Sequence, residues 1–183
     1  MNIDQLIISI ASDYEVTDDG KLSRLRATYK TNKGPKVKLG VGFDYLDAQS
    51  GYMLFGCKLD AKSKRRNIKS HRMIFYLTNG YLPDEVDHID HNKANNLPGN
   101  LRGSSRSQNC QNTSSRINST SRFLGVCWFK KNSKWMAQIS TNGKKIYLGS
   151  FTCEKEAAKV YNKAATEYYG EFANLNNIDR PFS

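Results

Sequence analysis

Residues 86–112, VDHIDHNKANNLPGNLRGSSRSQNCQN, constrain the fold of this chain more than any other stretch. An acid directly precedes a histidine at Asp87 and His88, which we expect at the end of a short strand. A loop rich in the turn formers Asn, Pro and Gly follows, and the chain can then return as a second strand. A serine after that strand can cap a helix that carries Asn109. The stretch therefore predicts the order strand, loop, strand, helix.

The Asp87-His88 pair also indicates a chemistry. A carboxylate beside a neutral imidazole can hold a hard cation with one group and activate a water molecule with the other. Alone, such a pair is more often a surface turn than a site, but the spacing of the whole stretch favours a nuclease site. Some residues have plainer alternatives. Asp90 could only stabilise the turn, Asn96 could only tolerate a left-handed backbone, and Asn112 could only bond local carbonyls.

The stretch resembles the HNH nuclease motif in its H-N-N form, as found in phage and intron-encoded homing endonucleases with the ββα-metal fold. The matching residues are Asp87-His88-Ile89-Asp90, Asn95-Asn96, Asn100-Leu101-Arg102 and Asn109-Cys110-Gln111-Asn112. The resemblance implies that His88 is the general base and that Asp87 and Asn109 are metal ligands. It also implies that Asn100 belongs to the catalytic set and pins the loop between the strands. His91 stands where relatives usually have glycine.

The small number of strong ligands in this motif bears on the metal. Asn109 stands where many relatives have histidine, which leaves mainly oxygen donors. Such a set favours one hard divalent ion, Mg²⁺ or Mn²⁺, shared with a substrate phosphate, and argues against a tightly held zinc ion.

The charge of the chain indicates its partner. The formal net charge is +11 and aromatic residues make up 11% of the sequence, a combination that favours a nucleic acid. The four cysteines form no C-x-x-C pair, so we expect reduced thiols. No basic segment precedes the apolar N-terminal run, and no run of about 18 apolar residues occurs. We therefore expect a cytoplasmic protein of a phage-infected or bacterial cell that binds double-stranded DNA, with neither a membrane nor a small-molecule substrate.

The N-terminal part predicts mixed secondary structure. A short helix is expected within residues 1–10, and residues 14–59 alternate with Gly- and Asp-rich turns as in a small antiparallel β region. This region is similar to the short β module that precedes the catalytic motif in phage homing endonucleases. The basic run at residues 62–69 includes Arg65 and Arg66, and it reads equally well as a solvated loop or as a set of phosphate contacts.

An apolar helix is expected next, at residues 71–77, and Asn79-Gly80 is its stop signal. His71 begins this helix at the H-R pattern that such nucleases carry here. We favour a packed, hydrogen-bonded role for His71 over a catalytic one.

A second unit is predicted after the Ser- and Thr-rich residues 113–121, which read as a linker. Residues 125–126, 135–139 and 145–149 have the pattern of three strands, and Asn142-Gly143 is typical of a tight hairpin between the last two. Thr152 can cap a following helix with a face of small apolar residues. We expect one helix lying on a three-stranded antiparallel sheet.

This second unit resembles the APETALA2-type DNA-binding domain. The matching features are Gly125-Val126, the Trp135, Ala137 and Ile139 alternation, Leu148-Gly149-x-Phe151, the Ala157-Ala158-x-x-Tyr161-x-x-Ala164-Ala165 helix and the closing Gly170-x-x-Ala173-x-Leu175-Asn176. In that family the sheet lies in the major groove, which implies DNA contacts at Lys134, Ser140, Lys145 and Tyr147. Lys130 and Lys131 are further expected phosphate contacts. Cys127 and Phe129 occupy positions where arginines are usual, so the resemblance does not imply a target sequence.

Together these patterns predict an α+β protein with two domains. Residues 1–117 would hold the small β module and the ββα-metal core, and residues 118–183 would hold the three-stranded sheet packed on one helix. The predicted activity is site-preferring, metal-dependent hydrolysis of DNA phosphodiester bonds, as in homing endonucleases. Two other classes remain open, a catalytically inactive DNA-binding regulator and a structural RNA-binding protein.

Overall fold

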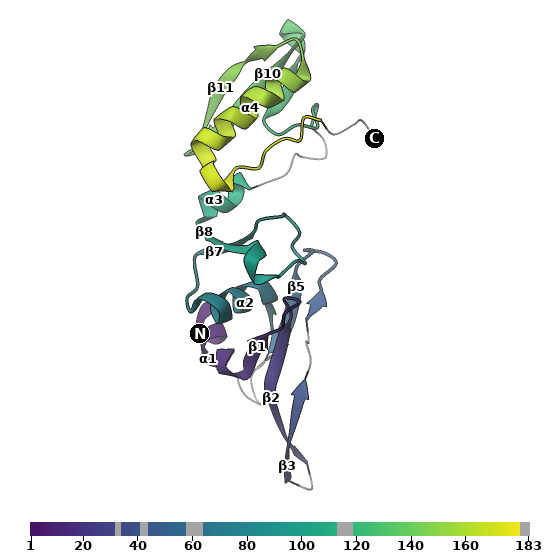
Figure 1. Cartoon of the computed structure of the whole chain (residues 1–183), viewed down its shortest axis with the longest axis vertical. Coiled ribbons are helices and arrows are strands. Elements are labelled where there is room, and N and C mark those ends of the chain that lie inside the picture. Colours follow the sequence, from purple (N-terminus) through teal and green to yellow (C-terminus); the bar gives the residue numbers. More distant parts are fainter. Residues whose placement is uncertain (32–33, 41–43, 58–63, 113–118, 180–183) are drawn as a thin grey trace. The chain divides into compact units, whose positions relative to one another are not determined.

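The computed structural model describes residues 1–31, 34–40, 44–57, 64–112 and 119–179 (Figure 1). Contacts divide the chain into two compact units, Met1–Ser105 and Arg106–Ser183. The predicted turn at residues 32–33, the start of the basic run at residues 62–63 and most of the predicted linker, at residues 113–118, lie outside the described residues.

Both helices predicted in the first unit are confirmed. Helix α1 (Ile3–Ile10) begins with a capping box, in which the Asn2 side chain accepts from the Gln5 amide at 2.8 Å and the Gln5 side chain accepts from the Asn2 amide at 3.1 Å. Helix α2 (Ser70–Asn79) ends at Gly80, whose φ of 77° is the left-handed conformation that glycine adopts at little cost.

The predicted antiparallel β region forms two small sheets. The first contains β1 (Tyr14–Val16), β2 (Leu22–Thr31) and β3 (Gly34–Gly40) in that order. The second contains β4 (Tyr45–Leu46), β5 (Met53–Cys57) and β6 (Arg66–Lys69) in that order.

Strand β6 lies inside the basic run, so the loop reading of that run is wrong for its last four residues. These residues form a strand because of a contact with a distant part of the chain. Ile68 is 1% exposed and pairs in register with Phe55 of β5, which is also 1% exposed. One buried isoleucine between exposed charged neighbours therefore ties the basic run into the sheet.

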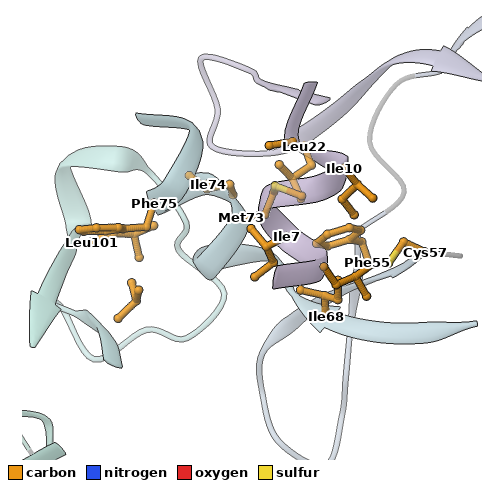
Figure 2. Close-up of a cluster of buried hydrophobic side chains, with 13 residues drawn as sticks. Ile7, Ile10, Leu22, Phe55, Cys57, Ile68, Met73, Ile74, Phe75 and Leu101 are labelled. Carbon is orange, nitrogen blue, oxygen red and sulfur yellow. The ribbon is translucent and has the colours of Figure 1, made fainter. Parts of the chain in front are cut away.

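One hydrophobic core joins the helices and strands of the first unit (Figure 2). Its buried side chains come from α1 and the turn after it, from β2, β5 and β6, and from α2 and the two strands that follow it. They include Ile7, Phe55, Ile68, Met73, Ile74 and Leu101. Helices α1 and α2 each contribute three buried side chains to this core, and α2 also contacts the strands on either side of it in the sequence. The site residues predicted at the end of the next strand therefore rest on a packed helix.

The motif region has the predicted order of elements. Strand β7 (Glu85–His88) pairs with β8 (Leu101–Ser104), and the connecting loop ends in a 3-10 turn, η2 (Pro98–Asn100). Helix α3 (Arg106–Gln111) follows directly. By its contacts α3 belongs to the second unit, where it lies against η4 (Gly170–Phe172). The boundary between compact units thus precedes α3, and the division at residues 117 and 118 stays a prediction.

The second unit is the predicted sheet with one helix. Strands β9 (Val126–Phe129), β10 (Lys134–Thr141) and β11 (Lys144–Phe151) form an antiparallel sheet with β10 in the middle, and Figure 1 shows α4 (Glu154–Tyr169) lying across it. The hairpin residues Asn142 and Gly143 both have positive φ, 50° and 73°, as this tight turn requires.

Small side chains allow α4 to lie close to the sheet. Its buried residues Ala157, Ala158 and Ala165 pack over the strands, and β10 contributes the buried Ala137 and Ile139.

The expectation that Thr152 caps α4 is wrong. The N-cap residue is Cys153, which makes no side-chain cap hydrogen bond. The helix begins one residue later than that cap would require. Instead, the Ser121 hydroxyl donates to the Glu154 carboxylate in the first helical turn at 2.7 Å. In the part of the chain that the structure describes, no helix is both long and apolar enough to cross a bilayer.

Candidate active site

The β7–β8 hairpin places Asp87 and His88 side by side in the chain and faces each with a residue of the partner strand. Asp87 pairs in register with Arg102, and His88 pairs with Leu101. Both Asp87 and His88 are buried, at 6% and 4% exposure. The pair is buried within a strand, so the alternative that it forms a surface turn is wrong.

Asn100 ties the two ends of the hairpin loop together. Its side-chain oxygen accepts from the Asp90 amide at 3.1 Å, and its side-chain nitrogen donates to the Asp90 carboxylate and to the Asn95 carbonyl, both at 2.8 Å. Its backbone carbonyl accepts from Ile89 at 2.9 Å. Asp90 also accepts from the Asn95 side chain at 2.7 Å. Asp90 thus stabilises the turn through its hydrogen bonds to Asn95 and Asn100. Asn100 makes the hydrogen bonds that are needed to hold the two ends of the loop together.

His88 is held as a neutral imidazole in an aromatic setting. Burial lowers the pKa of His88, although a hydrogen bond to Asn96 and the nearby Asp90 and Asp87 carboxylates act in the opposite direction. The Nε2 atom lies 3.1 Å from the Asn96 side-chain oxygen. Because that oxygen can only accept, Nε2 carries the proton and Nδ1 is the basic nitrogen.

Asn96 contacts His88, a role that the sequence patterns did not predict. The left-handed conformation considered for it does not occur, because the non-glycine residues with positive φ among those described are His91, Ser133 and Asn142. Asn96 is instead 4% exposed. Its backbone lies against Gly20, where an added Cβ would come within 2.8 Å of the Asn96 carbonyl carbon. The glycine turn of the first sheet therefore lets Asn96 approach His88.

Two aromatic rings pack against the His88 imidazole. The His71 ring lies edge-on at a centroid distance of 4.9 Å, and the Tyr52 ring lies at 6.0 Å. Tyr52 and His71 also contact each other at 5.1 Å. These three rings come from β7, from the start of α2 and from the residue before β5, so only the tertiary fold brings them together.

The packing expected for His71 is confirmed, at 3% exposure. The hydrogen bond expected with it is not found at its Nδ1 atom, which no partner reaches among the described residues. Burial, followed by the charges of His88, Lys69 and Arg72, lowers the pKa of His71 to about 2. His71 is therefore a neutral packing ring at physiological pH.

The lowered pKa of His71 predicts how the stability of the fold depends on pH. The unfolded chain binds a proton at His71 below pH 6.5 whereas the folded chain does not, so stability is lost as pH falls from 6.5 toward about 2. The loss is about 1.4 kcal/mol per pH unit in that window. His71→Phe keeps a ring but does not titrate, so the fall in its urea midpoint between pH 7 and pH 5 should be smaller than in the wild type. Equal falls in the two proteins would contradict this account.

The Asp87 carboxylate is paired with a cation of its own unit. Arg102 donates to Asp87 Oδ2 from Nε at 3.0 Å and from its terminal nitrogen at 2.8 Å. The Arg102 side chain is largely buried, at 15% exposure. Asp87 keeps a hard oxygen donor suited to Mg²⁺ or Mn²⁺, but a metal ion there must share or replace the charge of Arg102.

The other predicted metal ligand, Asn109, lies in α3 and belongs to the second unit. Its role as a ligand stays a prediction. Within the described ranges, no group of three or more His, Cys, Asp and Glu side chains could hold a metal ion. One carboxylate and one amide oxygen fit a hard divalent ion only if water and a phosphate complete its shell.

The four sheet positions implied by the resemblance lie on one face of the second unit. Gln138 pairs with Tyr147 and Ser140 pairs with Lys145, so these side chains share a face. The intervening Ile139 is buried against α4, so this face points away from the helix. Lys134, Ser140, Lys145 and Tyr147 are all exposed, as are Lys130 and Lys131 in η3 (Lys130–Asn132). The structure thus gathers these positions onto one accessible surface.

Arg66 begins β6 in the first unit, and Arg65 directly precedes it. Both are exposed. Arg66 donates to the Met1 carbonyl at 3.1 Å, and the Arg65 side chain lies over Gly56. Their predicted phosphate contacts stay predictions.

Comparisons with known proteins agree with the two resemblances. A family model described as HNH endonuclease matches residues 69–111. The chain is 39% identical over 112 residues to an uncharacterized HNH endonuclease of Acanthamoeba polyphaga mimivirus, covering 60% of this chain and 57% of that protein. It is 29% identical over 116 residues to Protein 3.8 of Escherichia phage T7, covering 62% of this chain and 92% of that protein.

The C-terminal region is similar to plant transcription factors. It is 32% identical over 59 residues to the AP2-like ethylene-responsive transcription factor TOE2 of Arabidopsis thaliana, covering 32% of this chain and 12% of that protein. The chain therefore spans little more than half of the mimivirus relative and a small part of the plant relative. One region of the chain is thus similar to HNH endonucleases, and another is similar to AP2-like transcription factors.

Proposed function

We propose that this protein is a metal-dependent endonuclease that hydrolyses phosphodiester bonds of double-stranded DNA at a preferred site, in the manner of a phage homing endonuclease acting in the host cytoplasm. The observation that carries the proposal is the buried, neutral His88, oriented by Asn96 and directly preceded by the carboxylate of Asp87. A general base must be uncharged and fixed in one tautomer, and His88 meets both conditions.

In the proposed mechanism His88 Nδ1 accepts a proton from a water molecule. The resulting hydroxide forms a bond to phosphorus, and the bond from phosphorus to the 3′ oxygen breaks. The 3′ oxygen leaves with the electron pair of that bond and takes a proton from solvent. Asn96 keeps Nε2 protonated throughout, and burial keeps the imidazole from being charged before the reaction begins. Asp87 and Asn109 would hold one Mg²⁺ or Mn²⁺ ion, which would supply positive charge for the transition state.

The second unit would place the DNA. Its open sheet face carries Lys134, Lys145 and Tyr147, with Lys130 and Lys131 at one end, and Arg65 and Arg66 would add contacts from the first unit. Lysines at such positions bind phosphates and set the orientation of the protein on the duplex without reading sequence.

A supercoiled plasmid incubated with and without Mg²⁺ tests the proposal. We expect nicked or linear plasmid with Mg²⁺, intact plasmid with EDTA, and no cleavage by Asp87→Ala at low Mg²⁺. The buried Asp87–Arg102 pair favours a second candidate, a DNA-binding protein without activity, because the proposed ligand already has a counter-ion. Retention of the plasmid on a gel without any cleavage would select that candidate.

The Arg102 pair makes a prediction that does not depend on cleavage. Arg102→Met removes the positive charge from a buried carboxylate, and removing one partner of a buried pair costs about 3–5 kcal/mol. If Asp87 is a ligand, Mg²⁺ should recover part of this loss, about 2.7 kcal/mol at a hundred times the dissociation constant. The urea midpoint of Arg102→Met should therefore rise with Mg²⁺ more than that of the wild type.

The matched control for this measurement is the double variant Asp87→Asn with Arg102→Met. It lacks both charges, so its midpoint should not respond to Mg²⁺. The same Mg²⁺ response in the single and the double variant would remove Asp87 as a ligand.

A further inference from the structure

Two lysines of the first unit lie against one tyrosine ring beside the proposed base. The Nζ atom of Lys69 is 4.1 Å from the centroid of the Tyr52 ring, and that of Lys93 is 4.8 Å from it. Lys93 also donates to the Ser50 carbonyl at 3.1 Å. Lys69 ends β6, whereas Lys93 lies in the β7–β8 loop. Segments far apart in the sequence thus bring two ammonium groups to one place, called here the Tyr52 clamp (Tyr52, Lys69 and Lys93).

Neither lysine of the clamp forms an ion pair with an acid of the described residues. Among the described residues, the ion pairs use Lys21, Arg24, Arg72 and Arg102, and none involves Lys69 or Lys93. Two ammonium groups held against one ring repel each other, so the arrangement favours an anion between or beside them.

The position of Lys69 is unfavourable for the helix that it precedes. It is the N-cap residue of α2 and makes no side-chain cap hydrogen bond. A serine, threonine or aspartate is preferred there, and a positive charge at this end interacts unfavourably with the helix dipole. The stability of α2 therefore does not account for a lysine at this position.

The clamp lies next to the proposed catalytic histidine. The Tyr52 ring contacts both imidazoles, with centroids 6.0 Å from His88 and 5.1 Å from His71. Tyr52 is half-buried, while both lysines are exposed. An anion held by the clamp would therefore lie close to the base and remain reachable from solvent.

We propose that Lys69 and Lys93, held by the Tyr52 ring, bind a backbone phosphate of the DNA next to the one that is cut. This inference rests on the proposed function and adds a phosphate site in the first unit to the contacts expected from the C-terminal sheet. Its ligand class is a phosphodiester of duplex DNA, and Tyr52 is a positioning residue that acts through the two lysines.

The test measures DNA affinity against salt in full-length protein carrying His88→Ala, so that binding is separated from cleavage. Loss of one neutralised phosphate makes the slope of log affinity against log salt concentration shallower by about 0.9. Because both lysines are proposed to bind one phosphate, the double variant Lys69→Gln with Lys93→Gln should reduce the slope by about that amount, and each single variant should reduce it by a part of that amount. Lys159→Gln is the matched control, because it removes an exposed lysine from α4 and should leave the slope unchanged.

Two tyrosine variants test the role of the ring. Tyr52→Phe keeps the aromatic face and should keep the slope, whereas Tyr52→Leu should make the slope shallower although both lysines remain. Thermal unfolding of each variant shows that it is folded. Slopes for the lysine variants that match Lys159→Gln would overturn the proposal, as would equal slopes for the two tyrosine variants.

Cleavage of plasmid by the same substitutions in otherwise wild-type protein separates the two proposals. If the clamp binds a phosphate equally in the ground and transition states, KM rises while kcat stays unchanged. If the wild type does not cut but the slopes change as expected, the proposed nuclease function fails and the phosphate site stands.

Discussion

His88→Ala is expected to reduce the rate of DNA cleavage by about 10²–10⁴-fold, which is the usual contribution of a general base. Its affinity for the same DNA should change little, because the imidazole is buried and the proton transfer occurs only in the reaction. Single-turnover cleavage and a gel-shift titration on one duplex measure both quantities. Cleavage at the wild-type rate would remove His88 from the mechanism.

A matched control for this prediction lies in the same loop. His91 is exposed and has a φ of 64°, a conformation that glycine adopts more easily than other residues. His91→Gly therefore removes an imidazole without adding strain, and we expect cleavage near the wild-type rate. A loss as large as that of His88→Ala would show that the loop as a whole, rather than one base, carries the activity.

The second large effect concerns the open face of the C-terminal sheet. The triple variant of Lys130, Lys134 and Lys145 to Gln should make the salt slope of DNA binding shallower by about 2.7, or about 0.9 for each phosphate contact. Binding at physiological salt should weaken and site preference should decline, since the second unit is proposed to place the DNA.

The control for the sheet variant uses three lysines of α4. Lys155, Lys159 and Lys163 are exposed, and their replacement by Gln removes the same charge from the same unit. We expect this variant to keep the slope of the wild type. Equal effects of the two triple variants would indicate general electrostatic attraction and would argue against a binding face on the sheet.

Sequence patterns predicted the order of the elements because their signals are local. Apolar residues at helical spacing mark α1, glycine ends α2, and Asn142-Gly143 closes the hairpin between β10 and β11. Strand, loop, strand and helix in the motif region follow from turn formers between short apolar segments. In each case the residues that decide the conformation are neighbours in the chain.

The cap of α4 and the strand in the basic run were predicted incorrectly for a related reason. The local pattern favours Thr152 as the cap, but the helix begins one residue later, where the Ser121 hydroxyl donates to Glu154 in the first turn. Strand β6 exists because Ile68 finds a partner in Phe55, and the surrounding basic residues carry no signal of that pairing.

By itself the sequence determined which residues could do chemistry, namely the acid, the histidine and the asparagines at their spacing. Only the tertiary structure decided the protonation, the charge pairing and the packing of these residues. Asn96 fixes the tautomer of His88, Arg102 neutralises Asp87, and Tyr52 joins two distant lysines at the site. The reason is physical: protonation, charge pairing and ring packing depend on burial and on partners brought together by folding, and neither is encoded in the spacing of neighbours along the chain.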